Sequence, residues 1–202
     1  MMTYVIGISG GSGSGKSLFL NRLSEKFPGQ ISVLSQDNYY KLREVQQVDE
    51  KGIQNFDLID AISIDKFESD LDLLKRGNEI SVIEYRYNNP SLKPQTFAIV
   101  PTSIIIVEGI FVLSYPQIVR HLDLKIFIET DNDSMLKRRI ERDQKERGYD
   151  RNDVIYRFEN HVMPAFEKHI EPFRKEADMI IPNYNNFDKA LEVICTFIQS
   201  RL

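Results

Sequence analysis

The chain has 202 residues, of which 42% are hydrophobic, and a formal net charge of −4 at pH 7. This size and composition predict one compact domain over residues 1–202. A surface that binds nucleic acid usually carries a basic excess, so the acidic balance excludes nucleic acid as an expected partner. The single cysteine excludes an internal disulfide. Without a signal peptide or an apolar run near ~18 residues, we expect a cytoplasmic protein that does not enter a membrane.

Short apolar runs rich in β-branched residues alternate along the chain with longer amphipathic patterns. The runs are typical of strands buried on both faces of a parallel sheet, and they cover residues 4–8, 31–34, 104–107, 124–128 and 179–181. Helical patterns cover residues 17–27, 65–76, 131–145, 154–175 and 187–201. Strands that alternate with helices predict an α/β fold with a doubly wound parallel sheet of about five strands.

A glycine-rich turn directly follows the first predicted strand. It fits the P-loop pattern G-x-x-x-x-G-K-[S/T], and its residues are Gly10, Gly11, Ser12, Gly13, Ser14, Gly15, Lys16 and Ser17. In such a loop the backbone N–H groups point at phosphate oxygens, the lysine reaches the β and γ phosphates, and the last hydroxyl binds Mg²⁺. The pattern predicts a nucleotide site and a P-loop NTPase fold.

Carboxylates end two of the predicted strands. Glu108 follows the run 104–107, where we expect it to hold Mg²⁺, because a hard cation prefers oxygen ligands. Asp37 follows the run 31–34, which we expect to lie beside the P-loop strand, near the γ-phosphate. It either accepts a proton from an attacking hydroxyl and helps to order the metal, or it is an ordinary aspartate in a turn. Tyr39 and Tyr40 come next and either stack on the acceptor or simply pack.

One segment breaks the alternation, and one of the alternating helices is unusually basic. Residues 79–85 and 95–100 flank a stretch rich in proline and asparagine, which predicts an inserted β-hairpin over about residues 79–100. The basic helix that starts at Asp131 is either a solvated charged face or a lid over about residues 131–150 whose arginines close on the phosphates. Arg139 and Arg142 share a face of this helix and are the leading candidates.

These segments together resemble the uridine kinase (uridine–cytidine kinase) family. The matching stretches are residues 10–17, 35–40, 55–61, 107–110, 138–148, 162–167 and 177–182. The resemblance implies an enzyme that uses ATP and Mg²⁺ to phosphorylate the 5′-hydroxyl of uridine or cytidine, giving the 5′-monophosphate. It also implies a homo-oligomer, either a tetramer or a dimer. The site roles that it implies are a general base at Asp37, a nucleoside pocket at Phe56, Asp57 and Tyr85, a substrate contact at Arg139, and phosphate contacts at Arg142 and Arg147.

Two places depart from the family pattern. The family has a His and an Arg that recognise the base in the hairpin, whereas this chain reads Y-R-Y-N-N-P-S-L over residues 85–92. Pro90 and Leu92 carry no side-chain donor that replaces them. Arg157 stands at a pocket position that is often Gln in the family, and it adds a positive charge.

These departures leave three functions open. The first is a pyrimidine nucleoside kinase. The second is the same chemistry on another small alcohol, as in the phosphoribulokinase, pantothenate kinase and nicotinamide riboside kinase families. The third is a non-catalytic nucleotide switch. The sequence also leaves the phosphate donor open between ATP and GTP.

Overall fold

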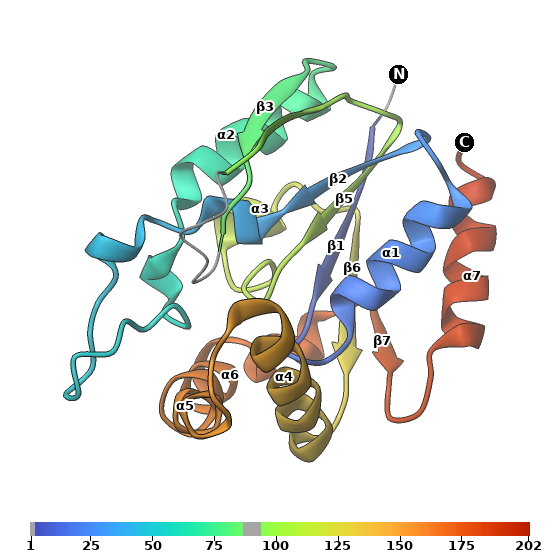
Figure 1. Ribbon diagram of the computed structural model, residues 1–202. Coiled ribbons are helices and arrows are strands. Elements are labelled where there is room, and N and C mark those ends of the chain that lie inside the picture. The colour runs from blue at the N-terminus through green and yellow to red at the C-terminus, as the bar shows by residue number, and fades with distance from the viewer. Residues whose placement is uncertain (1–2, 87–93) are drawn as a thin grey trace.

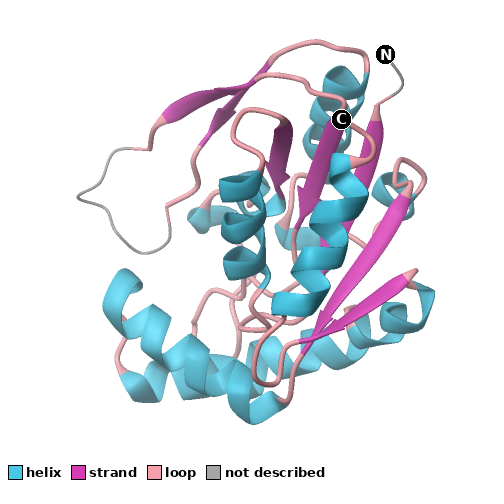
Figure 2. Ribbon diagram, turned by 90° about the vertical axis from the view of Figure 1, so that its right-hand side faces the viewer, coloured by secondary structure: helices cyan, strands magenta, loops and turns pink. Residues whose placement is uncertain are grey.

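The structure, a computed structural model, describes residues 3–86 and 94–202 (Figure 1). Five parallel strands form one sheet in the order β2-β5-β1-β6-β7. In chain order these strands are β1 Tyr4–Ser9, β2 Ile31–Ser35, β5 Ile104–Glu108, β6 Leu124–Glu129 and β7 Met179–Pro182. Figure 2 shows the strands side by side with helices packed around them. The predicted parallel α/β sheet is confirmed.

The strand order corrects one expectation. Strand β2 does not lie beside the P-loop strand β1, because β5 lies between them and pairs with both. In this register Glu108 at the end of β5 lies opposite Ile8 of β1 and Ser35 of β2. The end of β5 therefore stands between the P-loop and the turn that carries Asp37.

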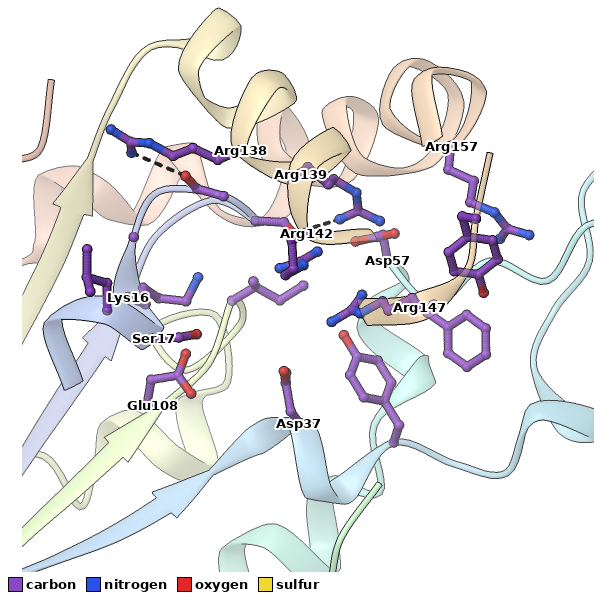
Figure 3. Close-up of a pocket in the computed structure, with 18 residues that line it drawn as sticks. Lys16, Ser17, Asp37, Asp57, Glu108, Arg138, Arg139, Arg142, Arg147 and Arg157 are labelled. Carbon is purple, nitrogen blue, oxygen red and sulfur yellow. Dashed lines mark hydrogen bonds between the residues drawn. The ribbon is translucent and has the colours of Figure 1, made fainter. Parts of the chain in front are cut away.

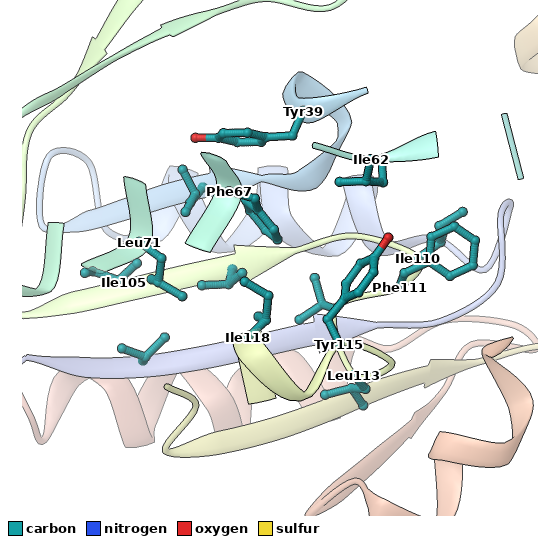
Figure 4. Close-up of a cluster of buried hydrophobic side chains, with 14 of the residues drawn as sticks. Tyr39, Ile62, Phe67, Leu71, Ile105, Ile110, Phe111, Leu113, Tyr115 and Ile118 are labelled. Atoms are coloured by element: carbon teal, nitrogen blue, oxygen red, sulfur yellow. The ribbon is translucent and has the colours of Figure 1, made fainter. Parts of the chain in front are cut away.

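Helices cover both faces of the sheet. In chain order they are α1 Lys16–Lys26, α2 Ile64–Lys75, α3 Pro116–Val119, α4 Asn132–Arg147, α5 Arg151–Arg157, α6 Met163–His169 and α7 Asp188–Gln199. One hydrophobic layer joins Ile105 of the sheet to Phe67 of α2 and Ile118 of α3 (Figure 4). The opposite layer joins Ile106 to Phe19 of α1 and to α7. Because both faces are covered, most residues of the strands are apolar.

The helix predicted over residues 154–175 is not continuous. Helix α5 passes into a π-helical turn, Phe158–Val162, α6 follows, and a 3₁₀ segment covers Glu171–Glu176. Pro164 lies in the first turn of α6 and Pro172 in the first turn of the 3₁₀ segment. Proline has no N–H to donate to a helical hydrogen bond, so the regular pattern breaks at both places.

The inserted hairpin is present as two antiparallel strands, β3 Ile80–Ile83 and β4 Thr96–Ile99, which form a separate sheet. Ile80, Val82 and Ile99 are buried in the same layer as α2. The departures predicted at Pro90 and Leu92 fall in residues 87–93, outside the described residues.

Helices α4, α5 and α6 lie together at the carboxyl ends of the strands (Figure 1). The basic helix α4 begins after Asp131, whose side chain accepts a hydrogen bond from the Ser134 N–H, and it ends at Gly148 with φ at 68°. This extent agrees with the sequence pattern. In residues 3–86 and 94–202, no helix combines the length and apolarity that crossing a lipid bilayer requires.

Candidate active site

A pocket opens at the carboxyl edge of the sheet, between the P-loop, the end of β5, the turn after β2 and helix α4 (Figure 3). Most of the predicted site residues line it: Ser12, Gly13, Gly15, Lys16, Ser17, Asp37, Phe56, Asp57, Glu108, Arg139, Arg142, Arg147 and Arg157. Parallel strands end at the same edge of a sheet, which is why residues far apart in the sequence meet here.

Glycine is required in the P-loop for two reasons. Gly10, Gly13 and Gly15 have φ of 147°, 90° and 102°, a region that side chains disfavour. A Cβ on Gly13 would also lie 2.6 Å from the carbonyl oxygen of Met135, so α4 packs directly on the loop. Gly10, Gly11 and Ser14 are buried and do not line the pocket.

Lys16 is a buried cation whose ammonium group is held by the loop itself. Its Nζ donates hydrogen bonds to the carbonyl oxygens of Gly10 at 2.8 Å and Gly11 at 3.1 Å. Burial lowers the pKa of Lys16, while the charges of Glu108 and Asp37 act in the opposite direction. The P-loop therefore presents a desolvated positive charge to two carboxylates.

Glu108 is a buried carboxylate that faces Asp37. The Ser35 hydroxyl donates to Glu108 Oε2 at 3.0 Å and accepts from the Asp37 N–H at 3.3 Å, which ties the ends of β2 and β5 together. Burial and the charge of Asp37 raise the pKa of Glu108 to about 7, although Lys16 and Ser35 lower it. Figure 3 shows Asp37, Glu108 and Ser17 directed at the same space.

This arrangement predicts a pH-dependent stability that Glu108 controls. Its pKa rises from 4.5 to about 7, so the folded chain holds an extra proton between these pH values, and the stability that this proton confers is lost as the pH rises through them. When the pH rises from 5 to 8 in the presence of EDTA, we expect the melting temperature of the wild type to fall by several degrees more than that of the Glu108→Gln variant. Parallel melting curves of the two proteins would contradict this.

Three arginines of α4 meet at one buried carboxylate, Asp143. The Arg142 Nε donates to Asp143 Oδ1 at 2.8 Å, and Arg147 Nη1 lies 3.4 Å from the same oxygen. Arg139 Nε lies 3.3 Å from Asp143 Oδ2 without hydrogen-bond geometry, and Arg139 Nη1 donates to the Ser12 hydroxyl at 2.6 Å. Burial would raise the pKa of Asp143, but Arg142 and the neighbouring guanidinium charges hold it below its usual value.

Removal of this shared carboxylate is expected to impair the arginines together. Asp143→Asn keeps the shape but loses the charge that orients the guanidinium groups, so we expect kcat to fall about 10- to 100-fold. Glu141→Gln is the matched control, because Glu141 is exposed on the same helix and loses the same charge. Steady-state kinetics of the two variants check this, and equal kcat values would contradict it.

The far end of the pocket is aromatic. The rings of Tyr40, Phe56 and Tyr85 contact one another, with centroid distances of 5.8 Å, 5.4 Å and 6.2 Å for Tyr40–Phe56, Tyr40–Tyr85 and Phe56–Tyr85. Tyr40 and Phe56 line the pocket together with the largely buried Asp57, and Tyr85 borders the adjoining groove beside the hairpin. Arg157 enters from α5, where it pairs with Asp153 at 3.3 Å.

Tyr39 corrects a prediction. It does not line this pocket; it is 2% exposed, packs on Phe67, and donates its hydroxyl hydrogen to Asp70 at 2.8 Å. The 3₁₀ turn Gln36–Tyr39 directs Tyr39 into the core, while the next residue, Tyr40, faces the pocket. Sequence reasoning could not choose between two adjacent tyrosines because the local turn geometry decides which one is buried.

The pocket also contains residues that the prediction omitted. Arg138 donates to the carbonyl oxygens of Gly13, Ser14 and Asn183, so this arginine ties α4 to the P-loop. Tyr149 lines the pocket with the Arg157 guanidinium 4.9 Å from its ring centre. The basic run on α4 was a signal for Arg138, but nothing local distinguished it from Arg139.

The sheet order, the P-loop with its buried lysine, and the two carboxylates across from it define a P-loop kinase. The family model described as "Phosphoribulokinase / Uridine kinase family" matches residues 5–190. The uridine kinase of Borrelia duttonii (strain Ly) is 39% identical over 199 residues, which cover 98% of this chain and 96% of that protein. The uridine kinase of Staphylococcus epidermidis (strain ATCC 12228) is 38% identical over the same shares. The chain belongs to the phosphoribulokinase/uridine kinase family.

Solved structures agree with the fold. A structure described as a possible uridine kinase from Bacillus stearothermophilus superposes with a TM-score of 0.62 at 19% identity, covering 89% of each chain. The phosphoribulokinase from Rhodobacter spheroides has a TM-score of 0.63 at 16% identity, covering 90% of this chain and 70% of that one. At these identities the likeness shows the fold alone.

Proposed function

We propose that the protein transfers the γ-phosphate of ATP to the 5′-hydroxyl of a pyrimidine ribonucleoside, uridine or cytidine, giving the nucleoside 5′-monophosphate and ADP. The observation that carries the proposal is one continuous pocket with the P-loop and Lys16 at one end, Asp37 in the middle, and Phe56 and Asp57 at the other. The names of the relatives at 38–39% identity support the nucleoside as acceptor.

The donor end of the pocket fits a nucleoside triphosphate with its metal. In residues 3–86 and 94–202, no three His, Cys, Asp or Glu side chains form a metal cluster. A Mg²⁺ ion that shares phosphate oxygens needs only one or two protein carboxylates. Ser17 and Glu108 would hold it, with Asp37 nearby, because burial and the charge of Asp37 disfavour the charged form of Glu108 and a cation would compensate that charge. When bound, the metal supplies positive charge to the β and γ phosphate oxygens.

The chain's own residues then account for the transfer. Asp37 accepts the proton of the acceptor hydroxyl while the oxygen of that hydroxyl attacks the γ-phosphorus. The bond from the γ-phosphorus to the β-γ bridging oxygen breaks, and ADP leaves. Lys16 and the guanidinium groups of Arg139 and Arg142 stabilise negative charge on the transferring group, and Arg147 lies beside them.

The acceptor end offers stacking and a carboxylate. Phe56 and Tyr40 present ring faces or edges to a flat base, and Asp57 can accept hydrogen bonds from ribose hydroxyls. The P-loop, Asp37 and this aromatic end together favour a nucleoside acceptor. A non-catalytic switch is not retained, since the chain belongs to a family of kinases.

One observation favours a second candidate. Arg157 lines the acceptor end of the pocket, and a cation there would suit an alcohol that also carries an anionic group. Asp153 pairs with Arg157 and reduces this charge, so the anionic acceptor stays the second candidate.

A coupled ADP-release assay tests both. MgATP and MgGTP are each offered with uridine, cytidine, purine ribonucleosides, nicotinamide riboside, pantothenate and ribulose 5-phosphate. We expect turnover with uridine or cytidine and ATP. Turnover confined to an anionic acceptor would replace the first candidate by the second, and no turnover with any acceptor would contradict both.

A further inference from the structure

The loop that precedes Phe56 and Asp57 in the chain is hydrogen-bonded to α5 and to the π-helical turn that follows it. Residues 46–55 form a loop in which Val48 and Gln54 make an antiparallel bridge. Asp49 closes the tip of this loop, since its Oδ1 accepts from the N–H groups of Lys51 and Ile53, both at 2.9 Å. These bonds lie within the loop and would fold it locally without any contact to the helices.

The other oxygen of Asp49 reaches across to a different part of the chain. Asp49 Oδ2 accepts from the Tyr156 hydroxyl at 2.9 Å and lies 2.8 Å from His161 Nε2. Tyr156 belongs to α5, and His161 belongs to the π-helical turn and is 3% exposed. Lys51 adds a cation over the Tyr156 ring at 4.0 Å. We call the contacts of Asp49 Oδ2 with Tyr156 and His161 the Asp49 clasp.

The Asp49 clasp joins two walls of the acceptor end. Phe56 and Asp57 continue directly from the loop, and Arg157 follows Tyr156 on α5; all three line the pocket. Arg157 Nη1 also donates to the carbonyl oxygen of Gln54 at 3.1 Å. This second hydrogen bond between α5 and the loop involves a residue that lines the pocket. A shift of the loop relative to α5 would therefore change the distance between these walls.

The π-helical turn between α5 and α6 contributes to the Asp49 clasp, because it contains His161. A π turn contains an extra residue compared with an α-helical turn and rotates the side chains that follow it. His161 lies inside this turn, and its buried ring is directed at a carboxylate from a loop more than 100 positions earlier in the chain. A buried imidazole costs free energy unless its nitrogens are hydrogen-bonded, and the carboxylate of Asp49 supplies such a partner, so the burial of His161 and the attachment of the loop depend on the same contact.

We propose that the Asp49 clasp is a positioning device that sets the width of the acceptor end, with Tyr156 and His161 as positioning residues that act through Phe56 and Asp57. The inference rests on the proposed function for the identity of the acceptor, but not for the attachment of the loop. None of the clasp residues lines the pocket or touches the P-loop, so the donor end should not depend on it.

The test removes the clasp and leaves the loop's own hydrogen bonds in place. The double variant Tyr156→Phe/His161→Phe keeps Asp49 and its bonds to Lys51 and Ile53, but loses both partners on the helices. We expect the KM for the nucleoside to rise about tenfold, with kcat and the KM for ATP within about twofold of the wild type. Glu50→Gln, a neighbouring exposed acid on the same loop, is the matched control and should leave all three values unchanged.

Equal changes in the KM for nucleoside and for ATP, or no change in either, would overturn the proposal. Hydrogen exchange of the backbone amides at residues 50–57 gives a second readout that needs no turnover, and we expect exchange to accelerate in the double variant only. If the wild type phosphorylates no nucleoside, the proposed function fails, and unchanged exchange in the double variant would still overturn the clasp. If that variant does not fold, Tyr156→Phe alone, which keeps His161, carries the same comparisons.

Discussion

Asp37→Asn is expected to lower kcat about 10²- to 10⁴-fold, because an amide cannot accept the proton that the attacking hydroxyl must lose. Asp37 lines the pocket between the P-loop and the aromatic end, and its side chain is directed into the space that it shares with Glu108 (Figure 3). The measurement is single-turnover transfer from MgATP to uridine, which isolates the chemical step from product release.

The matched control for this variant is Asp65→Asn, which makes the same chemical change at an exposed position at the start of α2. MgATP binding to Asp37→Asn should stay within about threefold of the wild type if proton transfer is the main role of the carboxylate. Retention of more than half of the single-turnover rate would contradict that role. A large loss of MgATP affinity with an unchanged rate would instead assign Asp37 to the metal.

Lys16→Met is expected to reduce kcat about 10²- to 10³-fold while leaving the ligand-free protein at least as stable as the wild type. The ammonium group stabilises charge on the transferring phosphoryl group, so its loss affects the transition state most. Its effect on folding has the opposite sign, because burial lowers the pKa of Lys16 and thus disfavours its charged form in the folded chain. Methionine keeps an unbranched apolar chain without the buried charge.

Two measurements separate these effects of Lys16→Met. Thermal unfolding without nucleotide reports the stability, and steady-state kinetics report the loss of transfer. Lys26→Met, at an exposed position of the same helix, is the matched control and should behave as the wild type in both. A melting temperature that falls together with kcat would show that the lysine holds the P-loop through Gly10 and Gly11, and would contradict the separation of roles.

Local sequence patterns were sufficient to predict the features whose residues are neighbours in the chain. The P-loop depends on eight consecutive residues and a preceding strand, so both were predicted. The apolar runs indicated the five strands of the parallel sheet because burial on both faces favours apolar residues at most positions of each strand. Glu108 and Asp37 were found in the same way, since Glu108 directly follows such a run and Asp37 stands three positions after the end of another.

The strand order, the choice of pocket tyrosine and the grouping of the arginines depend on how the elements pack in three dimensions. The place of β5 between β1 and β2 follows from which strands pair, and hydrophobicity does not encode that choice. Tyr39 and Tyr40 are adjacent residues of the same type, so the sequence does not distinguish them. The turn after β2 places Tyr39 in the core and Tyr40 in the pocket. The grouping of arginines at Asp143 needed the helix face to be known as well as the helix.

The amino-acid sequence by itself determined the class of fold, the phosphate-binding loop and the two carboxylates, because these depend on residue type, on spacing within short segments and on the order of those segments along the chain. Only the tertiary structure decided the strand order, the pocket tyrosine and the contacts of Asp49 with Tyr156 and His161. Those features arise when segments that are separate in the sequence pack together, as Asp49 does with residues more than 100 positions later, and the energy of such packing depends on three-dimensional geometry that no local pattern contains.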